Sequence, residues 1–156
     1  DLIKGLGISA EMRVPDIEGA TGNLHTNFKG KAKAAIDAFK DGYDYVYLHM
    51  EAPDECGHQG DTAGKIRSIE IIDSVVVRYI KSELDRLSIP YRMLIMPDHP
   101  TPISIKTHSR EAVPYLIYDS TKDISNGAVT YSEREAANTK KYYADAPSLI
   151  EHFLEK

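Results

Sequence analysis

The feature that most constrains the fold is a long amphipathic pattern between residues 62 and 87. Apolar side chains recur there at intervals of three and four positions, which predicts a helix with one face packed on a sheet. Asp61 comes just before the pattern and is predicted to cap the helix, because its carboxylate can accept hydrogen bonds from the first backbone N–H groups. The apolar positions are Ile66, Ile69, Ile72, Val76, Ile80, Leu84 and Leu87.

Three further segments have the composition of strands. Residues 43–50, YDYVYLHM, alternate between tyrosines and aliphatic side chains, whereas residues 91–96 and 112–118 are short and mostly apolar. Helical spacing also predicts a helix over residues 24–42, and a terminal helix is predicted over residues 148–156, after Pro147. Strand, helix and strand therefore alternate along the chain. This order predicts an α/β fold in which helices flank a largely parallel sheet.

The size and charge of the chain narrow its class. Its 156 residues suit a single domain, residues 1–156, with a real hydrophobic core. The net charge of -5 argues against a nucleic-acid partner or an anionic membrane, and the longest uncharged apolar stretch, SVVV, is far too short to span a bilayer. The single cysteine, Cys56, cannot form an internal disulfide, which fits a cytoplasmic protein.

Acidic and histidine side chains follow the first predicted strand, residues 43–50. Asp54 and His58 are four positions apart, so one turn of helix would place both on the same side. Pro53 is tolerated at the start of such a turn, and Gly57 is expected to let the backbone bend there. By itself, an acidic residue and a histidine at this spacing are more often a solvated helix surface than a metal site.

A second group follows the strand predicted over residues 91–96. Asp98 and His99 lie in the proline-stiffened loop PDHPTP, and His108 belongs to the same loop system. Loops after the carboxyl ends of parallel strands meet at one edge of the sheet, so both groups are predicted to converge. Carboxylates mixed with imidazoles suit Mn²⁺ or Zn²⁺ and suit Mg²⁺ less well. Two such ions could clamp the attacking and leaving oxygens of a phosphoryl transfer.

Three stretches taken together resemble one known family. VPDIEGATG, YLHMEAPDECGHQGD and MPDHPTPISIKTH resemble the metal-binding half of the alkaline phosphatase superfamily, and within it the cofactor-independent phosphoglycerate mutases of the archaeal type. The resemblance runs from about Leu2 to Tyr118. It implies an alkaline phosphatase-like core and the interconversion of 3- and 2-phosphoglycerate through a phosphoserine enzyme, a step of glycolysis and gluconeogenesis.

The resemblance also implies a set of metal ligands. Asp54, His58 and His108 would hold one divalent ion, and Asp98 and His99 would hold a second. The ions are expected to be Mn²⁺, with Mg²⁺, Zn²⁺ or Co²⁺ as alternatives. The implied partner is a phosphorylated small molecule.

One departure from the family concerns the nucleophile. The resemblance implies a nucleophilic serine in an N-terminal segment, ahead of an inserted domain, and none of Ser9, Ser104 and Ser109 matches its position. The chain is therefore expected to be the C-terminal part of the catalytic core, truncated at its N-terminus and inactive alone. A truncated sheet is also expected to expose an edge and favour self-association.

Other functions remain open on the sequence alone. A homoserine kinase-type enzyme or a phosphatase on the same core would use the same ligands, and a metal-binding module without catalysis would need only the ligands. Lys65, in the first turns of the long helix, is either a solvated surface lysine or a contact for an anionic substrate.

Overall fold

The computed structural model describes residues 2–155, and the chain divides into two compact units. The first unit comprises the residues up to Ser88 together with Thr101–Thr107, and the second comprises Ile89–Pro100 together with the residues from His108 onward. The chain thus passes from one unit to the other three times. None of the helices among residues 2–155 is long and apolar enough to cross a membrane.

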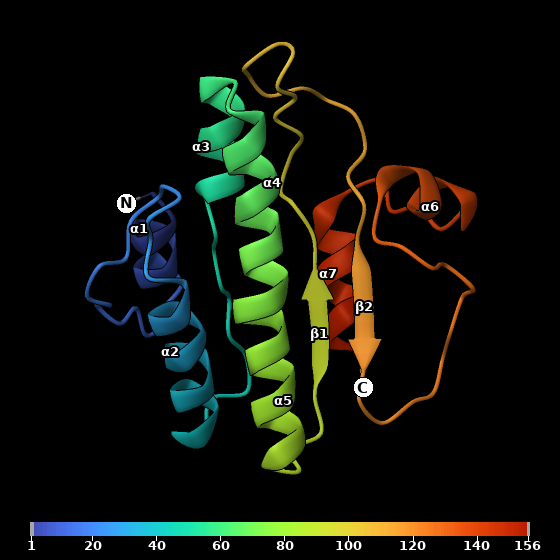
Figure 1. Ribbon diagram of the computed structural model, residues 1–156. Coiled ribbons are helices and arrows are strands. Elements are labelled where there is room, and N and C mark those ends of the chain that lie inside the picture. The colour runs from blue at the N-terminus through green and yellow to red at the C-terminus, as the bar shows by residue number, and fades with distance from the viewer. Residues whose placement is uncertain (1, 156) are drawn as a thin grey trace. The chain divides into compact units, whose positions relative to one another are not determined.

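The first unit is built from helices (Figure 1). They are α1 (Leu2–Ser9), α2 (Phe28–Lys40), α3 (Ala52–Gln59), α4 (Thr62–Ile71), the π-helix η1 (Ile72–Val77) and α5 (Arg78–Arg86).

The long helix predicted over residues 62–87 is confirmed, because α4, η1 and α5 follow one another without a break. The predicted cap is confirmed too: Asp61 Oδ1 accepts from the backbone N–H of Gly64 at 2.9 Å. The π-helical segment was not predicted. It holds more residues per turn than an α-helix, so the apolar face changes direction along the helix. Accordingly Val76 and Leu84 are buried while Ile66 and Ile69 are exposed, and the predicted stripe is only partly right.

The hydrophobic core of the first unit lies between α2 and the π-helical segment. Its buried residues are Phe28, Ala32, Ala52 and Val76, against which Leu48, Met50, Ile71, Ile72, Val75, Tyr79 and Ile80 pack. The helix predicted over residues 24–42 is therefore confirmed as the shorter α2.

Residues 43–50 were predicted to form a strand. They carry the expected alternation, since Tyr43, Tyr45 and Tyr47 are exposed while Leu48 and Met50 pack on the core. No strand is assigned there, however, because among the described residues only two other segments exchange ladder hydrogen bonds. The alternation reflects burial on one side of the chain, which needs no neighbouring strand.

The second unit contains β1 (Arg92–Ile95), β2 (Leu116–Asp119), α6 (Glu133–Asn138) and α7 (Ala146–Leu154) (Figure 1). The two strands pair antiparallel, from Arg92 opposite Asp119 to Ile95 opposite Leu116. The predicted parallel pairing is not found in the described part of the chain. Parallel neighbours need a crossover, usually a helix, and no helix lies between β1 and β2. The predicted terminal helix is confirmed as α7.

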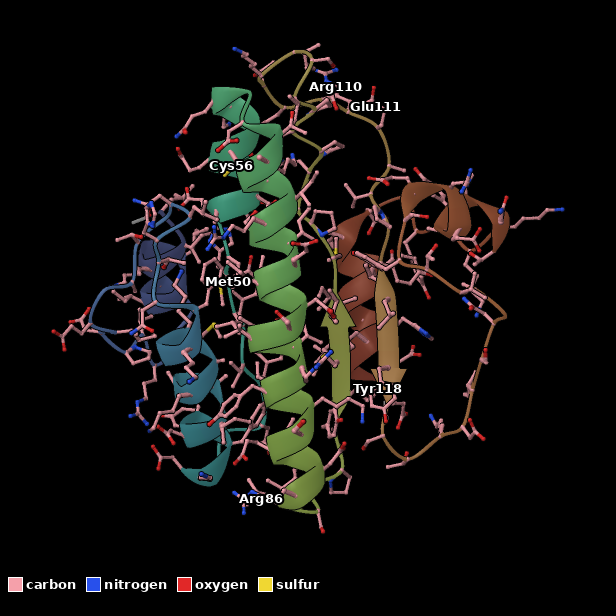
Figure 2. All side chains as sticks on the ribbon, viewed as in Figure 1. Met50, Cys56, Arg86, Arg110, Glu111 and Tyr118 are labelled. Atoms are coloured by element: carbon pink, nitrogen blue, oxygen red, sulfur yellow. The ribbon has the colours of Figure 1, made fainter. Side chains whose placement is uncertain are left out.

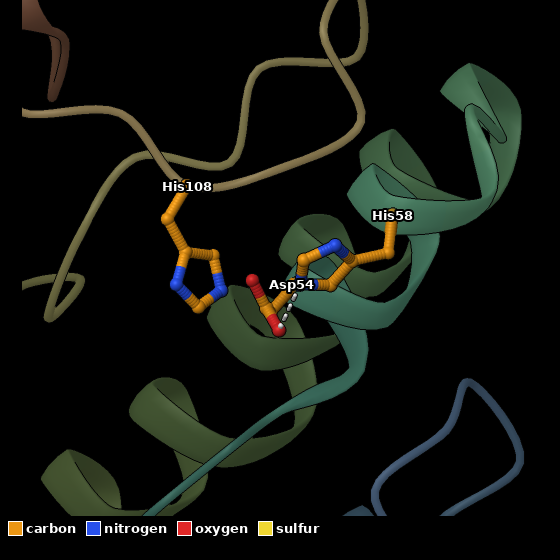
Figure 3. Close-up of side chains that lie close together, drawn as sticks. All are labelled: Asp54, His58 and His108. Carbon is orange, nitrogen blue, oxygen red and sulfur yellow. Dashed lines mark ion pairs between the residues drawn. The ribbon is translucent and has the colours of Figure 1, made fainter.

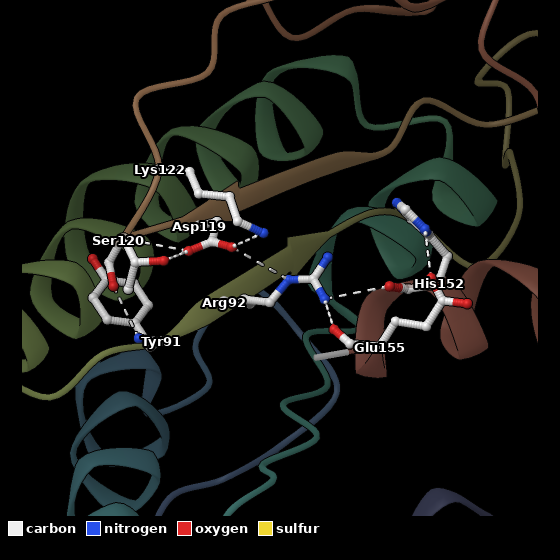
Figure 4. Close-up of polar contacts among 8 residues, drawn as sticks. Tyr91, Arg92, Asp119, Ser120, Lys122, His152 and Glu155 are labelled. Carbon is white, nitrogen blue, oxygen red and sulfur yellow. Dashed lines mark hydrogen bonds and ion pairs between the residues drawn. The ribbon is translucent and has the colours of Figure 1, made fainter.

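Polar contacts fasten β1 to β2 and to α7 (Figure 4). Arg92 Nη1 donates to the carbonyls of His152 at 3.3 Å and Glu155 at 2.6 Å, which satisfies acceptors at the end of α7. On the opposite strand, Asp119 accepts from the hydroxyl of Thr121 at 2.6 Å and its Oδ2 lies 3.2 Å from Lys122 Nζ. The Thr121 contacts, followed by Lys122, lower the pKa of Asp119 to about 2.

Candidate metal centre

Helix α3 carries the first two predicted ligands. Pro53 stands in its first turn, where a missing N–H costs nothing, and Gly60 ends it with a φ of 73° that favours glycine. Asp54 and His58 fall one turn apart on the same side, and Asp54 Oδ2 lies 3.3 Å from His58 Nε2 (Figure 3). The predicted helical turn and the convergence of this pair are therefore confirmed.

The second ring nitrogen of His58 fixes which atom offers a lone pair. His58 Nδ1 lies 3.0 Å from the backbone carbonyl oxygen of Lys106. A carbonyl oxygen can only accept, so Nδ1 carries the proton and the neutral ring has its lone pair on Nε2. That lone pair faces the carboxylate oxygen of Asp54, and two electron-rich atoms at this distance repel each other. A metal cation between them, or a second proton on the ring, would remove this repulsion. The donor atoms of this pair therefore fit a divalent ion.

A buried threonine completes the surroundings of Asp54. Thr101, 4% exposed, donates its hydroxyl hydrogen to Asp54 Oδ1 and accepts from Lys65 Nζ at its backbone carbonyl, at 2.6 Å. A Cβ at Gly57 would lie 2.7 Å from that carbonyl oxygen. Gly57 therefore permits a close approach within a regular helix, and the predicted bend is wrong. Lys65 is half-buried and hydrogen-bonded, so the solvated reading of this lysine is wrong as well.

Cys56 lies on the same helix but turns inward. It is buried and its Sγ would contact a Cβ placed at Gly64 of α4 at 3.0 Å (Figure 2). Burial, followed by the charge of Asp61, raises the pKa of the thiol. The sulfur therefore stays protonated near neutral pH, where a metal ligand would need to be a thiolate.

The second unit brings the other three predicted ligands together. Asp98 Oδ2 lies 3.4 Å from His99 Nε2, and the rings of His99 and His108 lie with their centroids 3.7 Å apart and their planes tilted by 32°. The backbone N–H of Ser109 donates to the carbonyl of Pro100 at 3.1 Å, which closes the loop that carries them. The loop is thus folded so that one carboxylate and two imidazoles share a small region.

The five predicted ligands therefore form one pair in the first unit and one trio in the second. Sequence reasoning missed Thr101 and Lys106. Thr101 stands between two prolines of the quoted PDHPTP loop, a signal that was available. Lys106 acts through its backbone carbonyl, which leaves no mark on the sequence.

Comparison with known families gives one match across almost the whole chain. The model of the Metalloenzyme superfamily matches residues 3–153. This match fits the metal-ligand chemistry of both groups.

Curated relatives carry a more specific name. A protein of Methanosarcina barkeri named 2,3-bisphosphoglycerate-independent phosphoglycerate mutase is 43% identical over 150 residues, which cover 96% of this chain and 37% of the relative. A Methanothrix thermoacetophila protein of the same name is 51% identical over 120 residues, 77% of this chain and 30% of the relative. A Geobacter sulfurreducens protein named as a probable mutase of this kind is 39% identical over 156 residues, 100% of this chain and 39% of the relative. The resemblance found in the sequence is confirmed.

The chain spans less than two fifths of the length of these relatives. A solved structure of a Pyrococcus horikoshii protein matches 88% of this chain and 35% of its own chain, with a TM-score of 0.71 and 33% identity. The family and this neighbour fit the predicted alkaline phosphatase-like α/β fold.

Proposed function

Since the chain belongs to the Metalloenzyme superfamily, we propose that it forms the metal-binding part of a 2,3-bisphosphoglycerate-independent phosphoglycerate mutase. Relatives 39–51% identical to it bear this name. The substrate is then a phosphorylated three-carbon acid, and the reaction moves its phosphoryl group between two hydroxyls. A place in glycolysis and gluconeogenesis, and in the cytoplasm, belongs to this proposal.

The proposed ligand set assigns Asp54, His58 and His108 to one ion, and Asp98 and His99 to a second. The donor types support this assignment, because each set contains a carboxylate and at least one imidazole. The ions proposed are Mn²⁺, with Mg²⁺, Zn²⁺ or Co²⁺ as substitutes.

The covalent chain supports the union of the two groups. His108 follows Lys106, whose carbonyl contacts His58, by two positions, so their Cα atoms lie within about 7 Å of each other. His99 precedes Thr101 by two positions, so their Cα atoms also lie within about 7 Å of each other. Thr101 is hydrogen-bonded to Asp54. These covalent links are compatible with the proposed ligand sets.

Divalent ions at these positions would neutralise phosphoryl oxygens and lower the pKa of an attacking hydroxyl. The carboxylates and imidazoles of the two proposed ligand sets would hold and orient those ions. In the proposed reaction the phosphoryl group leaves one hydroxyl of the glycerate for a serine and returns to the other hydroxyl, so no phosphate is released. The serine is assigned to none of Ser9, Ser104 and Ser109.

One observation supports the proposal most directly. His58 Nε2, left with its lone pair by the Nδ1 contact to Lys106, faces a carboxylate oxygen of Asp54 at 3.3 Å. An ordinary histidine and aspartate pair on a helix surface does not need a backbone carbonyl partner that fixes the tautomer of the imidazole.

The test is an assay of the whole mutase that would contain this chain, with Mn²⁺ and 3-phosphoglycerate, followed by phosphorus NMR. We expect 2-phosphoglycerate to appear without inorganic phosphate, and the reaction to stop on addition of a chelator. Release of phosphate would instead identify a phosphatase, and ATP-dependent phosphorylation of homoserine would identify a kinase. Tight Mn²⁺ binding without any turnover would favour a metal-binding module.

A further inference from the structure

We propose that Thr101 is a positioning residue of the metal centre, which fixes the orientation of the Asp54 carboxylate, and that Lys65 holds Thr101 in place. This inference rests on the proposed metal binding and adds two residues that are not themselves ligands. Asp54, His58, Lys65 and Thr101 all belong to the first unit.

The two oxygens of the Asp54 carboxylate have different contacts. Oδ1 accepts from the Thr101 hydroxyl, and Oδ2 lies 3.3 Å from His58 Nε2. The torsion that rotates an aspartate carboxylate has a broad energy well, so the side chain alone does not fix this plane. The Thr101 hydroxyl supplies what the rotamer does not, because rotation of the carboxylate would break a hydrogen bond to a charged group.

Thr101 is itself held from several directions. It is 4% exposed, and it stands between Pro100 and Pro102, which restrict the backbone on both sides. Its carbonyl oxygen accepts a hydrogen bond from Lys65 Nζ at 2.6 Å. The same oxygen packs closely against Gly57, where a Cβ atom would clash with it. A hydroxyl carried on so constrained a residue has little freedom to follow Asp54 if the carboxylate turns.

A purely structural role of Thr101 can be distinguished from a role in orienting Asp54 by measuring stability and metal affinity separately. If Thr101 only joins the loop to α3, its removal lowers the melting temperature and leaves the metal affinity of the folded protein unchanged. If Thr101 orients Asp54, the metal affinity falls even where the protein stays folded. Outer partners of metal ligands typically affect affinity by about 10- to 100-fold.

The experiment measures Mn²⁺ binding by titration calorimetry, with the melting temperature of each metal-free variant recorded alongside. Thr101→Val keeps the shape and removes the hydroxyl, and we expect its Mn²⁺ affinity to fall by about 10- to 100-fold. Thr101→Ser restores the hydroxyl and is expected to bind nearly as the wild type does. The matched control is Thr121→Val, because Thr121 makes the same kind of bond to Asp119 in the second unit, at 2.6 Å. Its Mn²⁺ affinity should not change.

The Lys65→Met variant provides a second test, because it leaves the Thr101 hydroxyl in place. Loss of the ammonium group that holds the Thr101 carbonyl should also weaken Mn²⁺ binding, by less than Thr101→Val does. If Thr101→Val does not fold, the Ser and Lys65→Met variants decide the matter.

Wild-type affinity in Thr101→Val, or equal weakening in the Val and Ser variants, would overturn the positioning role while the metal site stands. Unchanged affinity in Lys65→Met would overturn the part assigned to that lysine. A wild-type protein that binds no Mn²⁺ would remove both this role and the proposed function.

Discussion

Asp54 Oδ2 and His58 Nε2 face each other at 3.3 Å on one side of α3, while His58 Nδ1 is engaged by the Lys106 carbonyl. The backbone contact leaves the imidazole ready to act as a donor to a cation. The carboxylate beside it supplies the negative charge that a divalent ion requires.

Asp54→Asn should weaken Mn²⁺ binding by at least about tenfold, which corresponds to about 1.4 kcal/mol. The substitution keeps the size of the side chain and one acceptor oxygen but removes the charge. Titration calorimetry gives the affinity. Asp37→Asn is the control, because Asp37 forms a pair of the same four-residue spacing with Lys33 on α2, at 2.5 Å, without an imidazole. Equal affinities in the Asp54→Asn and wild-type proteins would contradict the ligand assignment.

Removal of metal should lower the thermal stability of the wild-type protein. A ligand at 100 times its Kd stabilises a folded state by about 2.7 kcal/mol, so dialysis against a chelator should reduce the melting temperature and added Mn²⁺ should restore it. Differential scanning calorimetry measures the change. In the Asp54→Asn variant the chelator should have much less effect. A chelator effect of equal size in both proteins would place the stabilising ion elsewhere.

Gly57→Ala should damage the centre although alanine favours helices. A methyl group there would lie 2.7 Å from the Thr101 carbonyl oxygen, so the loop must move away from α3. We expect a lower melting temperature and weaker Mn²⁺ binding. The control is Gly5→Ala in α1, where nothing lies within 4 Å of an added Cβ and where alanine should stabilise the helix by up to about 1 kcal/mol. Identical behaviour of the two variants would show that Gly57 does not mark a close approach.

Lowering the pH should remove the contribution of the Asp119 carboxylate to the stability of the folded protein. Its hydrogen bonds to Thr121 and its ion pair with Lys122 lower its pKa to about 2, below the ordinary value of 3.8. A lowered folded pKa means that the stabilisation is present above the unfolded pKa and is lost as the pH falls through the folded pKa. The wild type should therefore melt above Asp119→Asn at about pH 6, with the difference shrinking from about pH 4 toward about pH 2. Melting curves across this range test the effect, and a difference independent of pH would refute the role of the charge.

Most of the features that were predicted correctly from the sequence are local ones, which depend on residue spacing within a short segment. The four-residue spacing of Asp54 and His58 placed them on one face of a helix, and the carboxylate of Asp61 was assigned correctly as a cap. These features depend on neighbours within one or two turns, so they are written in short stretches of sequence. The grouping of Asp98, His99 and His108 is likewise local to one proline-stiffened loop.

Contacts between distant residues were harder to predict. Residues 43–50 have strand-like alternation without a ladder partner among the described residues, since one-sided burial alone produces the same pattern. The antiparallel pairing of β1 and β2 depends on the path of the chain between them, which composition does not reveal. The bond from Thr101 to Asp54 joins residues 47 positions apart, and a threonine carries no distinctive ligand signal.

The interleaving of the two units has a practical result for dissecting this molecule. Residues up to Ser88, expressed by themselves, would lack Thr101–Thr107 and with it the hydroxyl beside Asp54 and the carbonyl beside His58. A protease that nicks the backbone once after Ser88 would leave two other covalent links intact. Any scheme to graft or shorten this scaffold has to preserve a returning stretch of seven residues as well as the helices it meets.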